Sequence, residues 1–269
     1  MRFTPSAFLG SLVGKELKAT ATGATSGSFI SGGINYGFLE FATGSFNLNV
    51  SIGADIDILL VGGGGGGNTG SVATTVIGVG GGGGGVNLIS TRLLRGNYTI
   101  NVGQGGTPNE NGQSTTLTGY NINYSAGGGR ADGISGLPQF NSPGLSIGNC
   151  GLAGTSAGAG GGSAAATGSS PFCPGNNIPN GANGGQGLTY NFDGTASVYG
   201  SGGGGGGGTR AFSQGGTGGT NAGDGASYNT NATNAVNGFG GGGGGERAGN
   251  PNQAGRGGHG ALIIRYTLA

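Results

Sequence analysis

The sequence predicts a mainly β fold with little regular secondary structure, in which a small antiparallel β base carries a bundle of polyglycine II helices. Three observations lead to this prediction. Glycine accounts for 75 of the 269 residues, and uninterrupted runs of it occur at 62–67, 80–85, 202–208 and 240–245. Apolar, alternating stretches typical of strands flank these runs. Charged residues make up only 7% of the chain, whereas disordered chains are normally strongly charged.

The glycine runs need an unusual source of stabilisation if they are ordered. Glycine loses more conformational freedom on folding than any other residue, and fixing each backbone unit costs roughly 1–2 kcal/mol. An extended left-handed helix with about three residues per turn makes no internal hydrogen bonds, so its N–H and C=O groups must find partners in neighbouring chains. Runs of pure glycine therefore suit the interior of a bundle, and Gly-x-x segments suit its outer layer. A flexible linker and glycine-rich β-structure are the alternatives.

Strand signals come before the first glycine run. Residues 36–41 are rich in aromatic side chains, and residues 45–52 alternate strictly between apolar and polar side chains. Residues 55–61 alternate at first and then become continuously apolar, which is typical of a strand that enters a buried position. Because only short turns separate these three segments, we expect them to form one antiparallel sheet.

Further strands follow the second glycine run and close the sequence. Residues 86–89 and 97–102 are apolar or alternating, and residues 261–266 form another apolar strand. We expect this last strand to return from the glycine-rich region and to pair with the N-terminal sheet. Between residues 103 and 260, glycine blocks alternate at irregular spacing with segments rich in Asn, Ser, Thr and Pro. These segments are expected to turn at the ends of the bundle rather than to form a fixed-period solenoid.

This organisation predicts two parts. Residues 1–35 are interpreted as an N-terminal anchoring arm rather than a signal peptide, because Lys15, Glu16 and Lys18 separate the short apolar stretch from any cleavage site. Residues 36–269 are interpreted as a glycine-rich domain. Its β base is assigned to 36–61, 86–102 and 261–266, and its polyglycine bundle with loops is assigned to 62–85 and 103–260.

Composition restricts the classes of function. The formal net charge is +1, which gives no electrostatic basis for binding nucleic acid or an anionic membrane. The longest apolar stretches are far shorter than the ~20 residues that a membrane span needs. Cys150 and Cys173 are the only cysteines, and they form either a disulfide or two buried free thiols. His259 is the only histidine, so no metal site is predicted.

No arrangement of residues indicates catalysis. Gly-x-Gly-x-x-Gly matches recur because of the composition and lack the strand-then-helix context of a dinucleotide site. Asp55 and Asp57 fall on one face of a predicted strand, and we interpret them as a solvated face that discourages edge pairing. Nothing assembles a nucleophile, a base and an orienting group. We therefore expect no enzymatic activity and no cofactor.

Aromatic residues in the segments between glycine blocks are the candidate binding residues. Aromatic rings offer contact area at low entropic cost, and the neighbouring Asn, Ser and Thr side chains suit sugars or outer-membrane protein loops. The alternative is that each ring packs on glycine backbone or fills a subunit contact. The candidates are Tyr120, Tyr124, Phe140, Phe172, Tyr190, Phe192, Tyr199, Tyr228 and Phe239.

Three landmarks resemble a known family. The strand end Leu60-Val61-Gly62 that opens a glycine run, the segment 98–103 and the closing segment 260–266 are similar to those of a glycine-rich domain that is common in phage and other viral structural proteins. The alternation of blocks and loops also resembles the polyglycine-sandwich adhesins that cap phage tail fibres. In those adhesins the loops between glycine blocks bind the host receptor, which implies the same role for the loops of this chain.

The resemblance implies a virion structural protein, a fibre or surface appendage whose polyglycine scaffold displays loops for host attachment. The implied partners are other virion proteins contacted through the N-terminal arm, a host receptor that is a glycan or an outer-membrane protein, and further copies of the chain in a homo-oligomer such as a trimer. A purely architectural capsid or tail decoration, or a fibre joint, is one alternative. An ice-binding protein is another, and residues 215–220 show a hint of the regular array that it would need.

Overall fold

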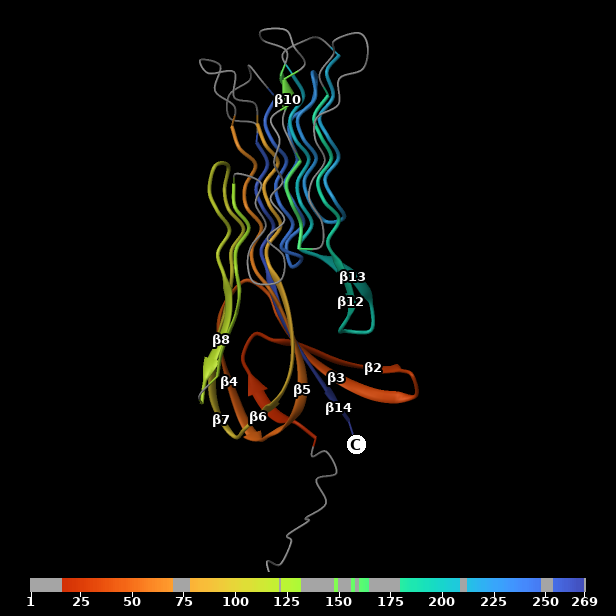
Figure 1. The fold of residues 1–269 in the computed structure, drawn as a ribbon. Helices are drawn as coiled ribbons and strands as arrows, with labels where there is room; N and C mark the ends of the chain where they lie inside the picture. The colour runs from red at the N-terminus through yellow and green to blue at the C-terminus, as the bar shows by residue number, and fades with distance from the viewer. Residues whose placement is uncertain are drawn as a thin grey trace, which may run out of the picture.

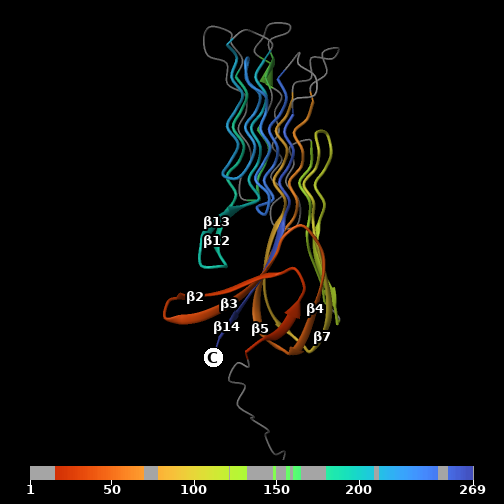
Figure 2. The same cartoon turned by 180° about the vertical axis from the view of Figure 1, so that it is seen from behind.

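The computed structural model describes residues 16–69, 78–120, 122–131, 148–149, 156–157, 160–164, 180–208, 212–247 and 254–268. Within these residues the regular secondary structure is all β and no helix occurs, which confirms the predicted mainly β class. Figure 1 shows an elongated molecule in which strands gather at one end and extended segments run side by side from them toward the other end. Figure 2 shows the same arrangement from behind.

The strands are short, and the first five follow one another closely up to residue 61. In chain order they are β1 (Lys18–Ala21), β2 (Thr25–Ser31), β3 (Ile34–Phe41), β4 (Gly44–Ile52), β5 (Ala54–Val61), β6 (Val86–Leu93), β7 (Gly96–Val102), β8 (Thr115–Gly119), β9 (Ile122–Ala126), β10 (Gly148–Asn149), β11 (Ser156–Ala157), β12 (Leu188–Asn191), β13 (Ala196–Tyr199) and β14 (Ala261–Thr267).

Two five-stranded antiparallel sheets form the base of the molecule. One has the strand order β1-β4-β7-β8-β9, and the other has the order β2-β3-β14-β5-β6. Successive side chains of a strand point to opposite faces, and Ile56, Ile58 and Leu60 of β5 share one buried core with Leu48 and Ile100 of the other sheet. Burying apolar surface stabilises a fold by about 25 cal/mol for each Å² removed from water. This hydrophobic effect stabilises the base.

The first three predicted strands do not form one sheet, so that prediction is wrong. β3 and β5 are separated by β14, whose Ile264 pairs with Leu39 on one side and with Ile58 on the other. β4 lies in the other sheet, between β1 and β7. From that sheet, β4 buries Leu48 and Val50 in the core that it shares with Ile58 of β5. The predicted pairing of the C-terminal strand with the N-terminal sheet is confirmed.

Several segments outside the predicted base also form strands. β1 pairs with β4, and β2 pairs with β3, so the described residues from 18 onward in the expected arm are part of the sheets. Residues 1–15 lie outside the described residues. The strands β1 and β2 gave a weak sequence signal because they consist largely of Thr, Ser, Ala and Gly. Hairpins β8–β9 and β12–β13 likewise occupy segments that we expected to be turns of the bundle.

The glycine run 62–67 donates backbone hydrogen bonds to three other segments in turn. Residues three positions apart donate to the same segment, so the direction of the N–H groups repeats every third residue. The first segment accepts the bonds Gly62 to Gly85, Gly65 to Gly82 and Asn68 to Val79. The second accepts the bonds Gly63 to Gln113 and Gly66 to Glu110, and the third accepts the bonds Gly64 to Gly258 and Gly67 to Gly255. All seven N···O distances are 2.8–2.9 Å.

Three further segments contact the remaining sides of this run. A Cβ atom on any of its glycines would lie closer than 3.0 Å to a backbone atom of one of these segments. The same segments donate back to the run, as in the bonds from Gly129 to Gly63, from Gly106 to Gly64 and from Gly243 to Gly65. The run is thus enclosed by backbone on all sides, and the four long runs are buried throughout.

The strand pairing of the base continues into these hydrogen bonds without a change of register. Val61 and Val86 face each other at the end of the β5–β6 pair, and Gly62 then donates to Gly85. Val61 also faces Ala261 of β14. The base therefore sets the alignment of at least three segments of the bundle.

Outer segments of the bundle carry side chains on the solvent side only. Gln214, Thr217 and Thr220 are exposed, and the glycines between them are buried or partly buried, as expected for an outer Gly-x-x segment. Side-chain oxygens supply acceptors where no further backbone segment follows. The amide oxygens of Asn180, Asn183 and Gln186 accept hydrogen bonds from the backbone N–H groups of Gln214, Thr217 and Thr220, respectively.

Replacing an enclosed glycine tests this packing. A Cβ atom on Gly64 would lie closer than 3.0 Å to the carbonyl group of Gly241, so we expect Gly64→Ala to destabilise the protein by about 3 kcal/mol or more, at or beyond the upper end of overpacking. Thr217→Ala, on the exposed row, is the matched control and should stay within about 0.5 kcal/mol of the wild type. Urea unfolding measures both. Equal stability of the two variants would contradict the packing.

Candidate functional site

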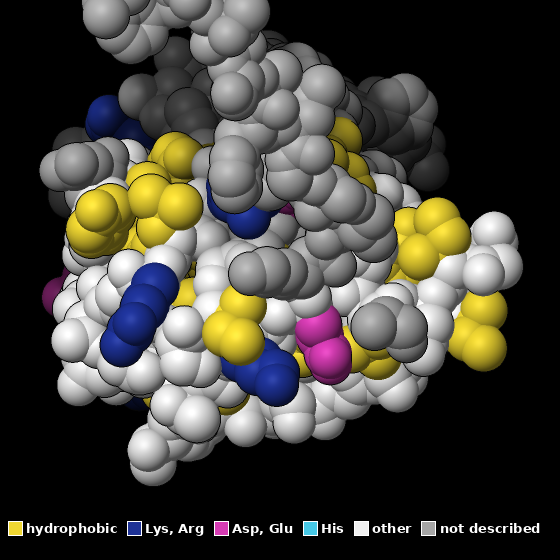
Figure 3. Space-filling view, turned by 90° about the horizontal axis from the view of Figure 1, so that it is seen from below, with side chains coloured by type: hydrophobic (Ala, Val, Ile, Leu, Met, Phe, Trp, Pro, Cys, Tyr) yellow, Lys and Arg dark blue, Asp and Glu magenta, His cyan; other side chains and the backbone are white. Residues whose placement is uncertain are grey.

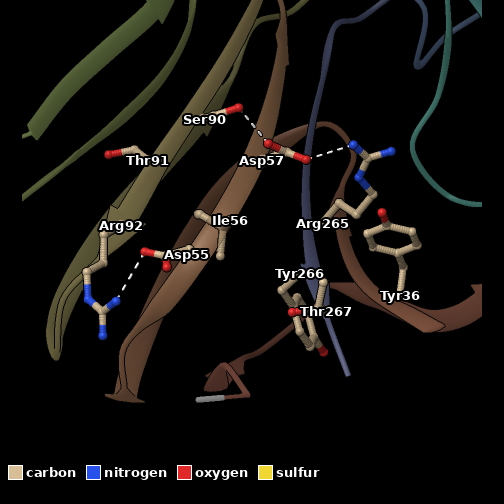
Figure 4. A pocket seen from close by; sticks show the side chains of 10 residues that line it. All are labelled: Tyr36, Asp55, Ile56, Asp57, Ser90, Thr91, Arg92, Arg265, Tyr266 and Thr267. Atoms are coloured by element: carbon tan, nitrogen blue, oxygen red, sulfur yellow. Dashed lines mark hydrogen bonds and ion pairs between the residues drawn. The ribbon is translucent and has the colours of Figure 1, made fainter. Parts of the chain in front are cut away.

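The outer face of the sheet β2-β3-β14-β5-β6 is partly covered and partly open. Next to the bundle, residues of the β12–β13 hairpin pack on Leu59 and Ile263. Further along the strands, the same face carries polar side chains around an open cavity of about 520 Å³ (Figure 4), which we call the basal groove. Figure 3 looks onto this end of the molecule and shows basic and acidic side chains close together among uncharged ones. The groove is lined by Tyr36, Asp55, Ile56, Asp57, Ser90, Thr91, Arg92, Arg265, Tyr266 and Thr267.

The charged side chains of the basal groove are paired across neighbouring strands (Figure 4). Asp57 on β5 accepts a hydrogen bond from Arg265 on β14, with Nη2···Oδ2 at 2.7 Å, and another from Ser90 on β6, with Oγ···Oδ1 at 2.6 Å. Asp55 pairs with Arg92 at 3.2 Å, and these two side chains are 72% and 40% exposed. Because each carboxylate faces a guanidinium, the groove carries little net charge.

The Arg265 guanidinium lies between two aromatic rings. Its Cζ atom is 5.0 Å from the ring centroid of Tyr36 and 4.6 Å from that of Phe192. Its Nη1 donates a hydrogen bond to the carbonyl oxygen of Asn191, at 3.2 Å. Cation–π contacts of this kind contribute about 0.5–1 kcal/mol at exposed sites and more when desolvated. Arg265 thereby ties the β12–β13 hairpin to the sheet.

The two carboxyl groups on this side of the sheet have opposite pKa shifts. Burial alone would raise the pKa of Asp57, but hydrogen bonds from Ser90 and Arg265 and the charge of Arg265 outweigh burial and lower it. Burial, helped by the charge of Asp193, raises the pKa of Glu40. The ionised form of Asp57 is therefore stabilised by folding, whereas that of Glu40 is destabilised.

This geometry suits structural ion pairs. Ser90 donates to a carboxylate that Arg265 already holds, and this pairing makes Asp57 a weaker base. The interpretation of Asp55 and Asp57 as protection of a sheet edge is wrong, because β5 lies between β14 and β6. Their ion pairs instead link β5 to both neighbouring strands.

A second surface lies at the end of the bundle remote from the base. The run 62–67 leads away from β5, and Asn68 at its far end accepts a hydrogen bond from the N–H of Glu246. The next residue, Arg247, places its Cζ atom 4.7 Å from the ring centroid of Tyr228. Tyr228 stacks on Phe212, with centroids 6.1 Å apart and planes 28° apart. We call Phe212, Tyr228 and Arg247 the distal aromatic patch.

Those of the predicted aromatic binding residues that the structure describes do not lie together on one surface. Tyr120 is 61% exposed but lies in the turn between β8 and β9, at the base. Tyr124 of β9 is half-buried, and its hydroxyl donates to Thr91 Oγ1 at 3.3 Å. Of the predicted set, Tyr228 alone belongs to the distal aromatic patch. Phe140 and Phe172, and with them Cys150 and Cys173, lie outside the described residues.

Four other predicted aromatics pack in and beside the β12–β13 hairpin. Tyr190 and Phe192 meet edge to face at 6.3 Å, and Tyr199 packs on Phe239 at 5.6 Å. Phe192 and Tyr199 are each only 2% exposed, and burial raises the pKa of Tyr199 to about 12. For these residues the alternative interpretation, packing as a small core, fits the contacts better than receptor binding.

Sequence reasoning missed Phe212 and Arg247 as members of the distal aromatic patch. Their place in the sequence could have indicated them, because each lies within a few residues of the end of a long glycine run. Their proximity could not be deduced, since it depends on which segments neighbour each other in the bundle.

His259 has a structural contact in the bundle. Its Nδ1 accepts a hydrogen bond from the N–H of Gly105, at 3.0 Å. Within the described part of the chain, no group of three or more side chains is placed to bind a metal ion. The same part contains no helix with the length and apolar character needed to cross a membrane.

Comparison with known proteins identifies the family. Residues 40–267 match the glycine-rich domain family, and the chain therefore belongs to it. No curated protein matches the sequence. The family assignment agrees with the landmarks at 60–62, 98–103 and 260–266, which in the structure lie where strands meet glycine segments.

The lowered pKa of Asp57 predicts a pH dependence of stability. Its ion pair stabilises the fold at pH values above the ordinary pKa of 3.8, and this contribution is lost as the pH falls through the lowered folded-state value. Asp57→Asn should therefore cost about 0.5–1 kcal/mol near neutral pH, allowing for solvent screening. The difference from wild type should shrink below about pH 4.

Thermal unfolding of both proteins across the acid range measures this difference. Asp55→Asn is the control, because its more exposed ion pair should contribute less. A difference between Asp57→Asn and wild type that does not change with pH would contradict the assigned ion pair.

Proposed function

We propose that this chain is a virion structural protein, a fibre or surface appendage in which a polyglycine II bundle is a rigid scaffold for host attachment. The observation that carries the proposal is the three-residue repeat of lateral hydrogen bonds along 62–67. A three-fold extended helix has this period, whereas the faces of a β-strand repeat every two residues.

The arrangement of the two ends supports a display function. Binding residues commonly lie on segments held by a rigid framework. Here the base occupies one end of the molecule (Figure 1). The distal aromatic patch, with Phe212 79% and Tyr228 44% exposed, lies beside the far end of the run 62–67. In this proposal the base and the N-terminal arm contact other virion proteins, and the distal end meets a host glycan or outer-membrane protein.

A purely architectural role is the second candidate, and one observation favours it. Apolar side chains are exposed near the base, including Ile30 at 75% and Ile34 at 47% in the β2–β3 hairpin. Exposed apolar groups of this kind can be covered by another subunit, as in a homo-oligomer such as a trimer. In that case the chain would be a decoration or a joint rather than an adhesin.

Ice binding requires a wider regular face than the outer segments provide. Thr217 and Thr220 are exposed three residues apart, but the same row continues with Gln214. The neighbouring row consists of amides that bond to its backbone. Thermal hysteresis in a solution of the purified chain would support ice binding over attachment.

Antibody labelling of assembled particles tests the proposal. An antibody raised against the full chain should label the exterior of virions produced in infected cells, and its Fab fragment should reduce adsorption to host cells. A Fab fragment against an unrelated antigen is the control. Absence of the chain from purified particles would overturn the virion assignment. Labelling without any effect on adsorption would support the architectural alternative instead.

A further inference from the structure

We infer that the distal aromatic patch is a carbohydrate-binding site, in which the Phe212 ring, supported by Tyr228, is the platform for the apolar face of a pyranose sugar. This inference rests on the proposed attachment function and specifies its ligand. It also differs from the sequence prediction, because Phe212 and Arg247 were not among the predicted residues and most of the predicted aromatics lie elsewhere.

The exposure of the two rings is the first argument. Phe212 is 79% exposed and Tyr228 is 44% exposed, whereas Phe192 and Tyr199, in the β12–β13 hairpin, are each 2% exposed. Large aromatic surface left in water is unfavourable, and such surface is typical of binding sites when it is adjacent to polar groups. The rings stack on each other, and Arg247 also lies over the Tyr228 ring, so the freer ring of the pair is that of Phe212.

The second argument is that the platform is held in place before any ligand binds. Phe212 has a φ of 69°, a left-handed conformation that is unfavourable for an aromatic residue and that is often retained at functional sites. The next residue, Ser213, is fully buried, and its Oγ donates to the carbonyl oxygen of Gly208 at 2.6 Å. The N–H of Tyr228 donates to the carbonyl oxygen of Ser213 at 2.9 Å.

Arg247 fixes the platform from another direction. Its guanidinium lies over the Tyr228 ring, and its Nε donates to the carbonyl oxygen of Gly208 at 3.2 Å. Gly208 thus receives hydrogen bonds from both Ser213 and Arg247. One backbone carbonyl at the end of a glycine run therefore joins Ser213, the residue after Phe212, to Arg247, whose guanidinium lies over the Tyr228 ring.

The chemistry around the rings favours a sugar over other ligands. Tyr228 lies in a turn closed by the bridge between Ser227 and Thr230, and the residues that follow it, Asn229, Thr230 and Asn231, are exposed. Their amide and hydroxyl groups can exchange hydrogen bonds with sugar hydroxyls while the Phe212 ring contacts the C–H face, the usual division of a small-molecule site into apolar area and a few polar contacts. The chain's net charge of +1 does not favour a nucleic acid.

Binding to an array of bacterial surface glycans tests this inference with the full chain. Saturation-transfer NMR with a sugar that the array identifies then gives the dissociation constant. We expect Phe212→Ala and Tyr228→Ala each to weaken binding about tenfold, equivalent to about 1.4 kcal/mol. Tyr228→Phe should retain most of the affinity, because it keeps the ring.

Leu94→Ala is the matched control, because Leu94 is 45% exposed and lies at the base. It should leave sugar binding unchanged, and thermal unfolding should show that all variants remain folded. Equal sugar binding by wild type, Phe212→Ala and Tyr228→Ala would overturn the assigned site. Adsorption that the Fab fragment blocks and that protease treatment of the cells abolishes, together with no sugar binding, would also overturn it but leave the attachment function standing. In that case the receptor is a protein.

Discussion

The lateral backbone hydrogen bond between glycine segments is the interaction on which the rest of the structure depends. The run 62–67 donates to three neighbours and accepts from others, and its glycines have no room for a Cβ atom. A side chain at such a position would separate two segments and break the bonds on both sides. The glycine content is therefore a steric requirement of the packing, and the conformational entropy that glycine loses is offset by bonds in which most interior N–H groups take part.

The base fixes the register of the glycine segments, which the bundle does not fix by itself. Bare glycine segments have no side chains to fix how far one slides along another, and a slipped arrangement would keep similar hydrogen bonds. The strands β5, β6 and β14 remove this freedom, because their register is set by a buried apolar core. The glycine segments attached to Val61, Val86 and Ala261 begin already aligned. Side-chain oxygens such as that of Asn183 then close the outer surface.

The sequence predicted the class of fold and the enclosed position of the pure glycine runs, because those follow from side-chain size alone. It also predicted that residues 261–266 return to the N-terminal sheet. It did not predict that β4 belongs to the opposite sheet, since the alternation of Leu48 and Val50 shows that a face is buried but not against which partner. The distal aromatic patch could not be predicted for the same reason. The contacts among Phe212, Tyr228 and Arg247 depend on which segments of the bundle lie side by side.

Hydrogen exchange of the glycine amides tests the central claim most directly. In protein labelled with ¹⁵N-glycine, the N–H groups of 62–67, 81–85 and 202–207 donate to backbone acceptors inside the bundle. They should exchange as slowly as those of the paired residues in β5 and β14, because opening any one of them requires the neighbouring segments to separate. Exchange at the rate of an unstructured peptide, with the strands of the base still protected, would contradict the account.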